Sequence, residues 1–253
     1  MNAPDVFCGT NGDQRNCGHC IVRHISLCSH VGGSDLEKFQ TLSQRKRFDR
    51  SEIIFEQDEA VENVFVITRG LVRLFRGMPS GKRQIIGFLG AGDLLGSIKR
   101  KSGSYCTIQA ITDLDVCSFK KDAFTNFLMD HPALCYALLV TAMDEIEAQY
   151  DHSILLARKQ APERLAAFLL LLSRRWKREQ ESENLVHIPM PRNDIADHLG
   201  LTSETISRTF SQFKAAGLIK FVDSKCALLT NVAQLHQLSG FDELPAHRMA
   251  IGL

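Results

Sequence analysis

The sequence has little of what marks a membrane or secreted protein. Among its 253 residues no apolar run approaches the roughly 18 residues that a membrane-spanning helix requires. The first ten residues contain neither the basic nor the apolar segment of a secretory signal peptide. We therefore expect a cytoplasmic protein that does not bind membranes.

Signatures of common enzyme classes are also missing. We find no phosphate-binding P-loop, no catalytic triad pattern and no paired catalytic carboxylates. An excess of one charge is missing too, since the net charge is +1. The basic residues are unevenly distributed, however, because positions 158–220 hold eleven Lys or Arg against seven Asp or Glu. This local excess favours a phosphate-facing surface. The missing catalytic signatures predict that the protein is not an enzyme.

The chain has eight cysteines. In the reducing compartment expected here, we do not expect them to form a disulfide framework. Cys17, Cys20 and Cys28 fall within twelve residues, which favours metal binding or redox sensing. A [4Fe–4S] cluster normally takes four thiolates, so a fourth would come from elsewhere in the chain. The spacing alone leaves open a cluster, thiols without a metal, or a zinc ion with a nearby histidine as further ligand. The candidate histidines are His19, His24 and His30.

Residues 34–130 have the pattern of an antiparallel β-domain. Short runs rich in β-branched and aromatic residues alternate with turn signals such as Arg69-Gly70. The runs are Ile53–Phe55, Val64–Ile67, Leu71–Phe75, Gln84–Leu89 and Thr107–Ile111. They predict a barrel or sandwich. Residues 1–33 lack such periodicity and indicate an irregular segment that a metal or a partner surface would order.

A long helix is predicted over residues 131–159. Pro132 suits a first helical turn, and apolar residues then recur at helical spacing without glycine or internal proline. The length of this helix favours packing against a second copy of the chain, in a homodimer. The residues expected at that interface are Leu138, Ala142, Ile146, Gln149 and Tyr150.

Residues 160–253 contain the most specific motif. Positions 193–217 predict a helix, a turn at Gly200 and a second helix that Thr202 caps. Ile206, Phe210 and Phe213 would bury the inner face of the second helix and leave a polar outer face suited to base edges and phosphates. The residues expected to contact DNA are Thr202, Ser203, Glu204, Ser207 and Arg208. The strand patterns at 218–222 and 227–230 predict a wing.

This order of a β-rich domain, a long helix and a winged helix-turn-helix resembles the Crp/Fnr superfamily of transcription regulators over nearly the whole chain. The most specific motif, Leu199-Gly-Leu-Thr-x-Glu204-Thr-Ile-Ser207-Arg208, is similar to the recognition helix of the Fnr branch. The resemblance implies an α+β fold with an antiparallel β-roll of the cyclic-nucleotide-binding kind, a dimerisation helix and a winged helix-turn-helix. It also implies that Glu204, Ser207 and Arg208 read a palindromic TTGAT-N4-ATCAA-like site.

The resemblance also bears on the effector. In the loop 92–107, Tyr105-Cys106 stands where cyclic-nucleotide-binding members carry Arg-Ser or Arg-Thr, so we expect no cyclic nucleotide. The Fnr branch instead holds an oxygen-labile [4Fe–4S] cluster, and the segment 112–119 resembles the one that supplies its fourth cysteine. The implied ligands are Cys17, Cys20, Cys28 and Cys117, with Cys106 as the rival for the fourth position. The loop 77–83 resembles the family's hairpin that faces RNA polymerase.

The seven-residue gap before Cys28 is similar to an FnrL/FixK-like variant of this oxygen-sensing branch. Gln149 stands where the branch carries an acidic residue that separates protomers without the cluster, so Glu147 and Asp151 would supply that repulsion here. The expected function is oxygen-responsive transcription control of anaerobic or microaerobic genes. The alternatives are a cluster-free thiol-redox or haem-dependent regulator of the same superfamily, and a cluster-bearing electron-transfer protein.

Overall fold

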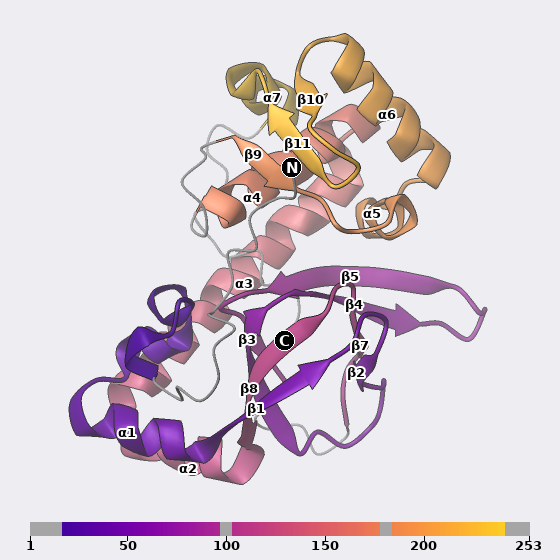
Figure 1. Cartoon of the computed structure of the whole chain (residues 1–253). Helices are drawn as coiled ribbons and strands as arrows, with labels where there is room; N and C mark the ends of the chain where they lie inside the picture. The colour runs from indigo at the N-terminus through magenta and orange to yellow at the C-terminus, as the bar shows by residue number, and fades with distance from the viewer. Residues whose placement is uncertain (1–16, 97–102, 178–183, 241–253) are drawn as a thin grey trace. The chain divides into compact units, whose positions relative to one another are not determined.

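The computed structural model describes residues 17–96, 103–177 and 184–240 (Figure 1). Their contacts divide the chain into two compact units. The first combines residues up to 77 with residues 88–142, and the second combines residues 78–87 with residues from 143 onward. None of the described helices is long and apolar enough to cross a membrane.

The β-domain contains two four-stranded sheets, which belong to the first unit except for residues 83–87 of the last strand. One has the strand order β1-β8-β3-β6 and the other has the order β2-β7-β4-β5. Phe65 of β3 stacks on Phe55 of β2 with ring centres 5.3 Å apart, so the two sheets share a core. The strands are β1 Ser43–Phe48, β2 Ile53–Phe55, β3 Asn63–Arg69, β4 Leu71–Gly77, β5 Arg83–Gly90, β6 Leu94–Leu95, β7 Thr107–Ala110 and β8 Leu114–Lys120. This arrangement confirms the predicted β-roll.

Helices cover the other face of the first sheet. They are α1 Gly33–Leu42, α2 Lys121–Asp130 and the beginning of α3 Pro132–Arg158. Phe39 of α1 packs against Phe119 of β8 and Phe127 of α2, with ring centres 4.7 and 4.9 Å apart. Leu134 and Ala137 of α3 belong to the same core. The first turns of α3 are therefore part of the β-domain's own packing.

The described part of the N-terminal segment lies against this same core. It forms three short turns, η1 Cys17–His19, η2 Arg23–Ile25 and η3 Leu27–His30. Leu27 and Val31 are buried members of the core, and the side chains of Cys28 and Cys117 pack at its edge. The apolar residues between the cysteines thus anchor the segment to the sheet. Residues 1–16 of the predicted N-terminal segment lie outside the described residues.

The second unit has the predicted winged helix-turn-helix. It contains α4 Ala161–Lys177, β9 Leu185–His187, α5 Arg192–Leu199, α6 Ser203–Ala215, β10 Ile219–Phe221, β11 Cys226–Leu229 and α7 Val232–Ser239. Its sheet has the order β10-β11-β9, which adds a third strand to the two expected for the wing. Arg164 of α4 donates from its guanidinium to the carbonyls of Leu156 and Leu199, at 2.8 Å each. This side chain satisfies carbonyls near the ends of both α3 and α5.

Candidate metal centre and nucleic-acid interface

The second helix of the motif, α6, begins where the sequence predicts. The hydroxyl of Thr202 accepts a hydrogen bond from the backbone N–H of Thr205 at 3.1 Å, and Gly200 adopts the left-handed conformation of the turn, with φ of 62°. Ile206, Phe210 and Phe213 are buried and form the inner face of the helix. The exposed residues on the opposite face are Ser203, Glu204, Ser207, Arg208 and Ser211. Both faces of α6 are as the sequence predicts.

The outer face of α6 presents complementary hydrogen-bonding groups. The hydroxyl of Ser207 donates to the carbonyl of Ser203 at 2.8 Å, which leaves its oxygen lone pairs available as acceptors. Glu204 is an acceptor and Arg208 a multiple donor, one turn apart on the same face. Acceptors match the amino groups of cytosine and adenine, and a guanidinium matches guanine O6 and N7. This surface can therefore distinguish base pairs.

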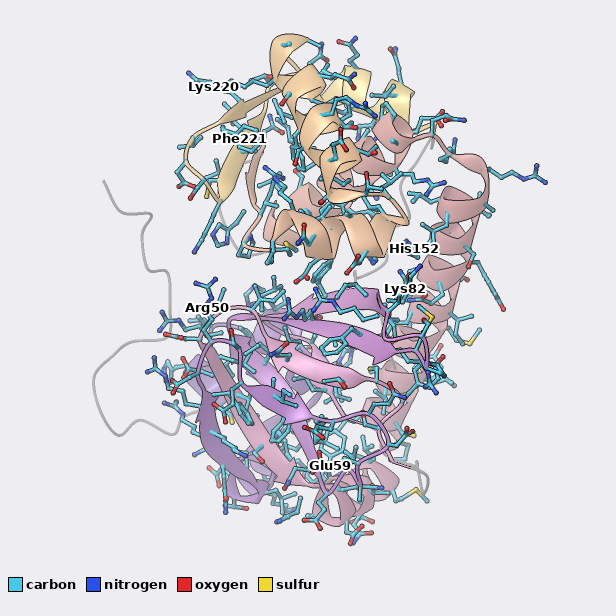
Figure 2. The ribbon with its side chains drawn as sticks, turned by 90° about the vertical axis from the view of Figure 1, so that its right-hand side faces the viewer. Arg50, Glu59, Lys82, His152, Lys220 and Phe221 are labelled. Atoms are coloured by element: carbon cyan, nitrogen blue, oxygen red, sulfur yellow. The ribbon has the colours of Figure 1, made fainter. Side chains whose placement is uncertain are left out.

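Arg192, at the start of α5, contacts both the second helix of the motif and the wing. Its guanidinium lies 3.5 Å from the ring centre of Phe210 on α6 and 5.4 Å from that of Phe221 on β10. Phe221 and the exposed Lys220 lie on this wing strand (Figure 2). Desolvation lowers the pKa of Arg192. Sequence reasoning missed this residue, because no local pattern shows which aromatic rings its side chain reaches.

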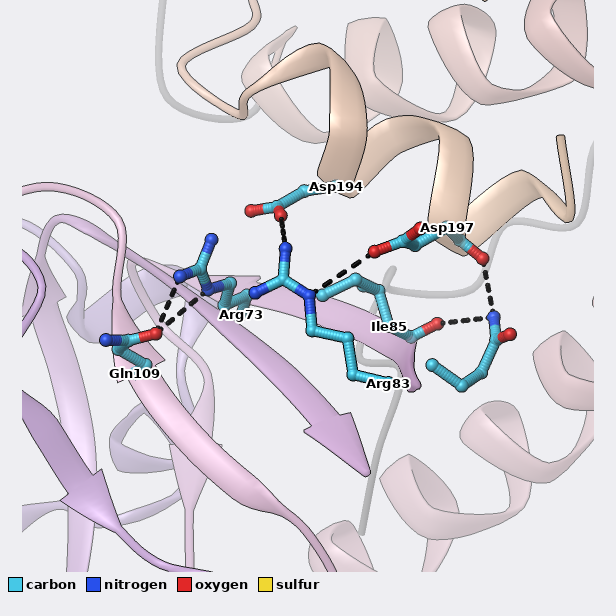
Figure 3. A network of polar contacts seen from close by, with 7 residues as sticks. Arg73, Arg83, Ile85, Gln109, Asp194 and Asp197 are labelled. Atoms are coloured by element: carbon cyan, nitrogen blue, oxygen red, sulfur yellow. Dashed lines mark hydrogen bonds and ion pairs between the residues drawn. The ribbon is translucent and has the colours of Figure 1, made fainter. Parts of the chain in front are cut away.

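Asp194 and Asp197 of α5 bind Arg83, which lies in the segment 78–87 of the second unit. The guanidinium of Arg83 donates to Asp194 at 2.6 Å and to Asp197 at 3.4 Å (Figure 3). The Asp194 side chain is only 1% exposed, so this ion pair is buried at the Asp194 end. The Gln84 amide donates to the carbonyl of Asp197 at 2.6 Å. Removing Arg83 would leave a buried carboxylate without this partner, which is strongly destabilising.

The four predicted cluster ligands lie close together in the first unit. The pKa of the Cys117 thiol is raised to about 12, first by burial and then by the negative charges of Cys20, Cys28 and Cys17, while Arg45 opposes the rise. Burial also raises the pKa of Cys28 and of Cys17, and the neighbouring thiolates add to it. Each thiol therefore lies within electrostatic reach of the others. None of the cysteines in the described ranges forms a disulfide.

The donor chemistry fits an iron–sulfur group better than a mixed zinc site. The four gathered groups are thiols, which is the ligand type of iron–sulfur clusters. His19, His24 and His30 are exposed, and His30 pairs with the Ser29 hydroxyl at 3.1 Å. Within the described residues, no three His, Cys, Asp or Glu side chains are gathered tightly enough to hold a metal ion as they stand. Binding would therefore draw the thiols further together.

Cys106, the rival fourth ligand, occupies a different place. It is buried just before β7, at the end of the second sheet, where its carbonyl accepts a hydrogen bond from the Ser104 hydroxyl. Cys117 lies on β8 in the first sheet, the sheet that the N-terminal turns cover. The thiols that act on Cys117 are those of the N-terminal turns. The structure thus brings Cys117, rather than Cys106, to the other three cysteines.

The loop expected to bind an effector is described only in part, since residues 97–102 lie outside the described residues. Tyr105 is exposed, and the Arg76 guanidinium lies 4.4 Å from its ring centre and donates to its carbonyl at 2.7 Å. On the neighbouring strands, Arg73 donates twice to the Gln109 side chain, at 3.1 and 2.7 Å (Figure 3). The expected absence of a cyclic nucleotide stays a prediction.

Helix α3 carries a continuous row of exposed apolar side chains. Leu139 is 58% exposed and Tyr150 is 66% exposed, which is unusual for large apolar groups on a long helix. The row comprises Tyr136, Leu139, Val140, Met143, Ile146, Tyr150 and Ile154. Of the predicted interface residues, Ile146 and Tyr150 belong to this row. Ala142 and Gln149 are half-buried, and Leu138 packs against the core of the first unit.

Comparisons with known proteins match both halves of the chain. The family model described as a cyclic nucleotide-binding domain matches residues 45–131, and the one described as a Crp-like helix-turn-helix domain matches residues 163–238. The transcriptional activatory protein AadR of Rhodopseudomonas palustris is 37% identical over 204 residues, covering 81% of this chain and 85% of that protein. The transcriptional activator protein FnrL of Cereibacter sphaeroides is 29% identical over 230 residues, covering 89% of this chain and 92% of that protein.

Solved structures agree with these matches. The structure of FixK2 from Bradyrhizobium japonicum has a TM-score of 0.72 at 31% identity, covering 79% of this chain and 99% of that one. A CooA mutant from Carboxydothermus hydrogenoformans has a TM-score of 0.69 at 21% identity, over 85% of this chain and 95% of that one, and so shares the fold. By sequence, domain order and fold, this chain belongs to the Crp/Fnr family of transcription regulators and is not an enzyme.

Proposed function

We propose that this regulator responds to oxygen through a [4Fe–4S] cluster held by Cys17, Cys20, Cys28 and Cys117. The observation that carries the proposal is the gathering of these four thiols, three from the N-terminal turns and one from β8, on one face of the first sheet. When bound, the cluster would supply bonds that join the N-terminal turns to β8. The remaining steps follow from the packing of the chain itself.

The N-terminal turns and the long helix share one core. Leu27 and Val31 flank Cys28 and pack in the same cluster as Leu134 and Ala137 of α3. Fixing the turns against β8 therefore holds the packing that positions α3. Loss of the cluster would release these apolar contacts and bias the helix toward another arrangement. The chain would thus convert a change at its thiols into a change at its long helix.

The exposed row on α3 is the proposed surface for a second copy of the chain. A homodimer would bury apolar side chains such as Leu139 and Tyr150 that the single chain leaves in water. Two copies of α6 would then face two half-sites, as a palindromic TTGAT-N4-ATCAA-like site requires. Glu204, Ser207 and Arg208 would contact the bases, while Thr202 and Ser203 at the start of α6 would contact phosphate or base edges.

The printed names of the relatives describe transcriptional activators, and we propose that this chain also activates transcription in the cytoplasm. The hairpin 77–83 between β4 and β5 would contact RNA polymerase. Its turn is well formed, since the N–H of Met78 donates to the carbonyl of Lys82 at 2.8 Å. On this proposal the effector is the cluster alone, without a cyclic nucleotide.

The first test is an anaerobic absorbance spectrum with iron and sulfide counts, repeated after exposure to air. The proposal expects a brown protein with about four iron atoms per chain that bleaches in air. A colourless protein that still binds the palindrome would favour a cluster-free regulator acting through thiol oxidation. A Soret band would favour haem, and a coloured protein without palindrome-specific binding would favour electron transfer.

The ligand assignment has a matched pair of variants. Cys117→Ser should abolish both iron retention and anaerobic binding to the palindrome, because the fourth thiolate is lost. Cys106→Ser, a buried cysteine in the same unit, should retain both. The reverse result would transfer the fourth position to Cys106. Iron retained by both variants would contradict a four-cysteine site.

A further inference from the structure

Arg23 lies inside the cysteine segment, between Cys20 and Cys28, and is held there by a specific bond. Its Nη2 donates to the carbonyl of Val31 at 2.7 Å, across the segment. Its Nε is buried and has no hydrogen-bond partner among the described residues. A buried donor without an acceptor is costly, so its presence in a folded protein calls for an explanation. One explanation is an acceptor that arrives with a ligand.

The charge of Arg23 acts on the thiol site itself. The pKa of Cys17 is raised by burial and by Cys20, and Arg23 and Arg45 both oppose this rise. Arg23 is therefore a cation within electrostatic reach of the Cys17 thiol, and its buried Nε–H has no acceptor among the described residues. A thiolate-bound cluster would bring sulfur atoms that accept hydrogen bonds at this place.

Arg45 reaches the site from a different element, strand β1. In the antiparallel pair of β1 and β8, Arg45 stands directly opposite Cys117. Directly opposed residues of such a pair project to the same face of the sheet, so the guanidinium and the thiol are neighbours. Arg45 also opposes the rise in the pKa of both Cys17 and Cys117. Two arginines from separate elements thus lie near the cysteines, Arg23 within reach of Cys17 and Arg45 within reach of Cys17 and Cys117.

We propose that Arg23 and Arg45 tune the reduction potential of the cluster: Arg23 donates its Nε–H to a cluster or thiolate sulfur, and both guanidinium groups offset the cluster's negative charge. This inference rests on the proposed function. Four thiolates make a bound cluster an anion, and one-electron reduction adds a further negative charge. Fixed positive charges and N–H donors favour the more negative state, so they raise the potential. Both residues are positioning residues, since the bonds to iron come from cysteines.

A structural role for Arg23 makes a different prediction. If its bond to the Val31 carbonyl were its only contribution, replacement would loosen the segment and lower iron retention without moving the potential of the cluster that remains. A charge effect moves the potential in all loaded molecules. It also weakens with salt for the exposed Arg45, because the solvent ions screen exposed charges.

The experiment uses the full-length protein loaded with cluster under anaerobic conditions. The midpoint potential is measured by spectroelectrochemical titration at low and high salt, with iron and sulfide counts on every sample. The variants are Arg23→Gln, Arg23→Lys, Arg45→Ala and Arg45→Lys. The matched control is Arg47→Ala, because Arg47 lies two residues further along β1 and pairs with Asp113 at 3.3 Å instead.

Arg23→Gln should shift the potential to more negative values, by a roughly tenfold change in the equilibrium constant for one-electron reduction, as expected for a hydrogen bond to a charged acceptor. Arg23→Lys should shift it less, because the charge remains. Arg45→Ala should give a smaller, salt-dependent negative shift that Arg45→Lys restores. Arg47→Ala should leave the potential unchanged.

Failure of the inference and failure of the proposed function are distinguishable. A wild-type protein without iron and sulfide would overturn both. A loaded wild type whose potential matches that of Arg45→Ala and Arg23→Lys would overturn the inference and leave the cluster in place. Should Arg23→Gln fail to retain cluster, the two lysine variants and Arg45→Ala still decide the result, since the lysines keep the positive charge and Arg45→Ala only shortens an exposed side chain.

Discussion

Two buried histidines predict that the second unit loses stability in mild acid. His152 of α3 (Figure 2) stacks on His198 of α5 with ring centres 4.4 Å apart. Burial lowers the pKa of His198 well below its usual value, His152 lowers it further, and a hydrogen bond with the backbone of Ile85 opposes them. Burial also lowers the pKa of His152, with the backbone of His198 opposing and Arg164 adding to the effect. Both rings therefore bind a proton less readily in the folded unit than in the unfolded chain.

The direction of the change in stability with pH depends on which state, folded or unfolded, binds more protons. As the pH falls below the ordinary histidine pKa of about 6.5, the unfolded chain takes up a proton on each ring more readily than the folded chain does. The stabilisation is fully present above that pH and declines as the pH falls below it. Each ring contributes a slope of at most about 1.4 kcal/mol per pH unit, so one unit below 6.5 the two together cost up to about 3 kcal/mol. That is a large share of a typical domain's stability of about 5–15 kcal/mol.

The assay is urea unfolding between about pH 8 and about pH 5.5, above the range in which most carboxylates titrate. Unfolding is followed by circular dichroism, to which the helices α4 to α7 of the second unit contribute. Wild type should lose stability below pH 6.5, and a His152→Gln, His198→Gln double variant should lose much less over the same range. Burial also lowers the pKa of His187, so the unfolding free energy of the double variant should keep a weak dependence on pH. Equal pH slopes in both proteins would refute the reasoning.

Three further predictions concern DNA binding and assembly. Arg208→Ala should weaken binding to the palindrome by about 1–3 kcal/mol and relax specificity at one base pair, as measured by competition with substituted sites. Equal weakening on all sequences would instead make Arg208 a phosphate contact. Thr202→Ala should cost about 1 kcal/mol of unfolding free energy through loss of its cap, while Thr202→Ser should restore most of it. Ile146→Glu should shift sedimentation toward the monomer, whereas Ser153→Glu on the same helix, outside the exposed apolar row, should do so less.

Much of the fold is predictable because local patterns determine it. The five β-rich runs correspond to β2, β3, β4, β5 and β7, and the helix from Pro132 corresponds to α3. The strand β1 could not be recognised, because its sequence Ser-Gln-Arg-Lys-Arg-Phe is charged and its strand character comes from pairing with β8. Edge strands of this kind depend on a partner far along the chain. Helix α2 did offer a local signal, since Phe124, Phe127 and Leu128 recur at helical spacing.

The difference between local patterns and distant partners also explains which parts of the candidate sites could be predicted. The outer face of α6 is predictable because a cap, a glycine turn and a helical period are all encoded within 25 residues. On α3 the period is correct but two apolar stripes compete: Leu134, Ala137 and Leu138 face the core of the first unit, while Leu139 and its row are exposed. Spacing alone does not say which stripe the β-domain covers. The positions of Arg23 and Arg45 beside the thiols depend on register and on a folded loop, which no local pattern encodes.

The packing between the cysteine segment and α3 has the right magnitude for a switch. Leu27 and Val31 are almost fully buried against a core that includes Leu134 and Ala137. Burying one such side chain contributes about 1.5–3 kcal/mol, so the two together contribute about 3–6 kcal/mol. Reversing a two-state equilibrium from 1:99 to 99:1 requires about 5.5 kcal/mol. On the proposed mechanism the cluster therefore need not touch the dimer interface, because the upper end of this burial energy reaches what such a reversal of the α3 arrangement requires.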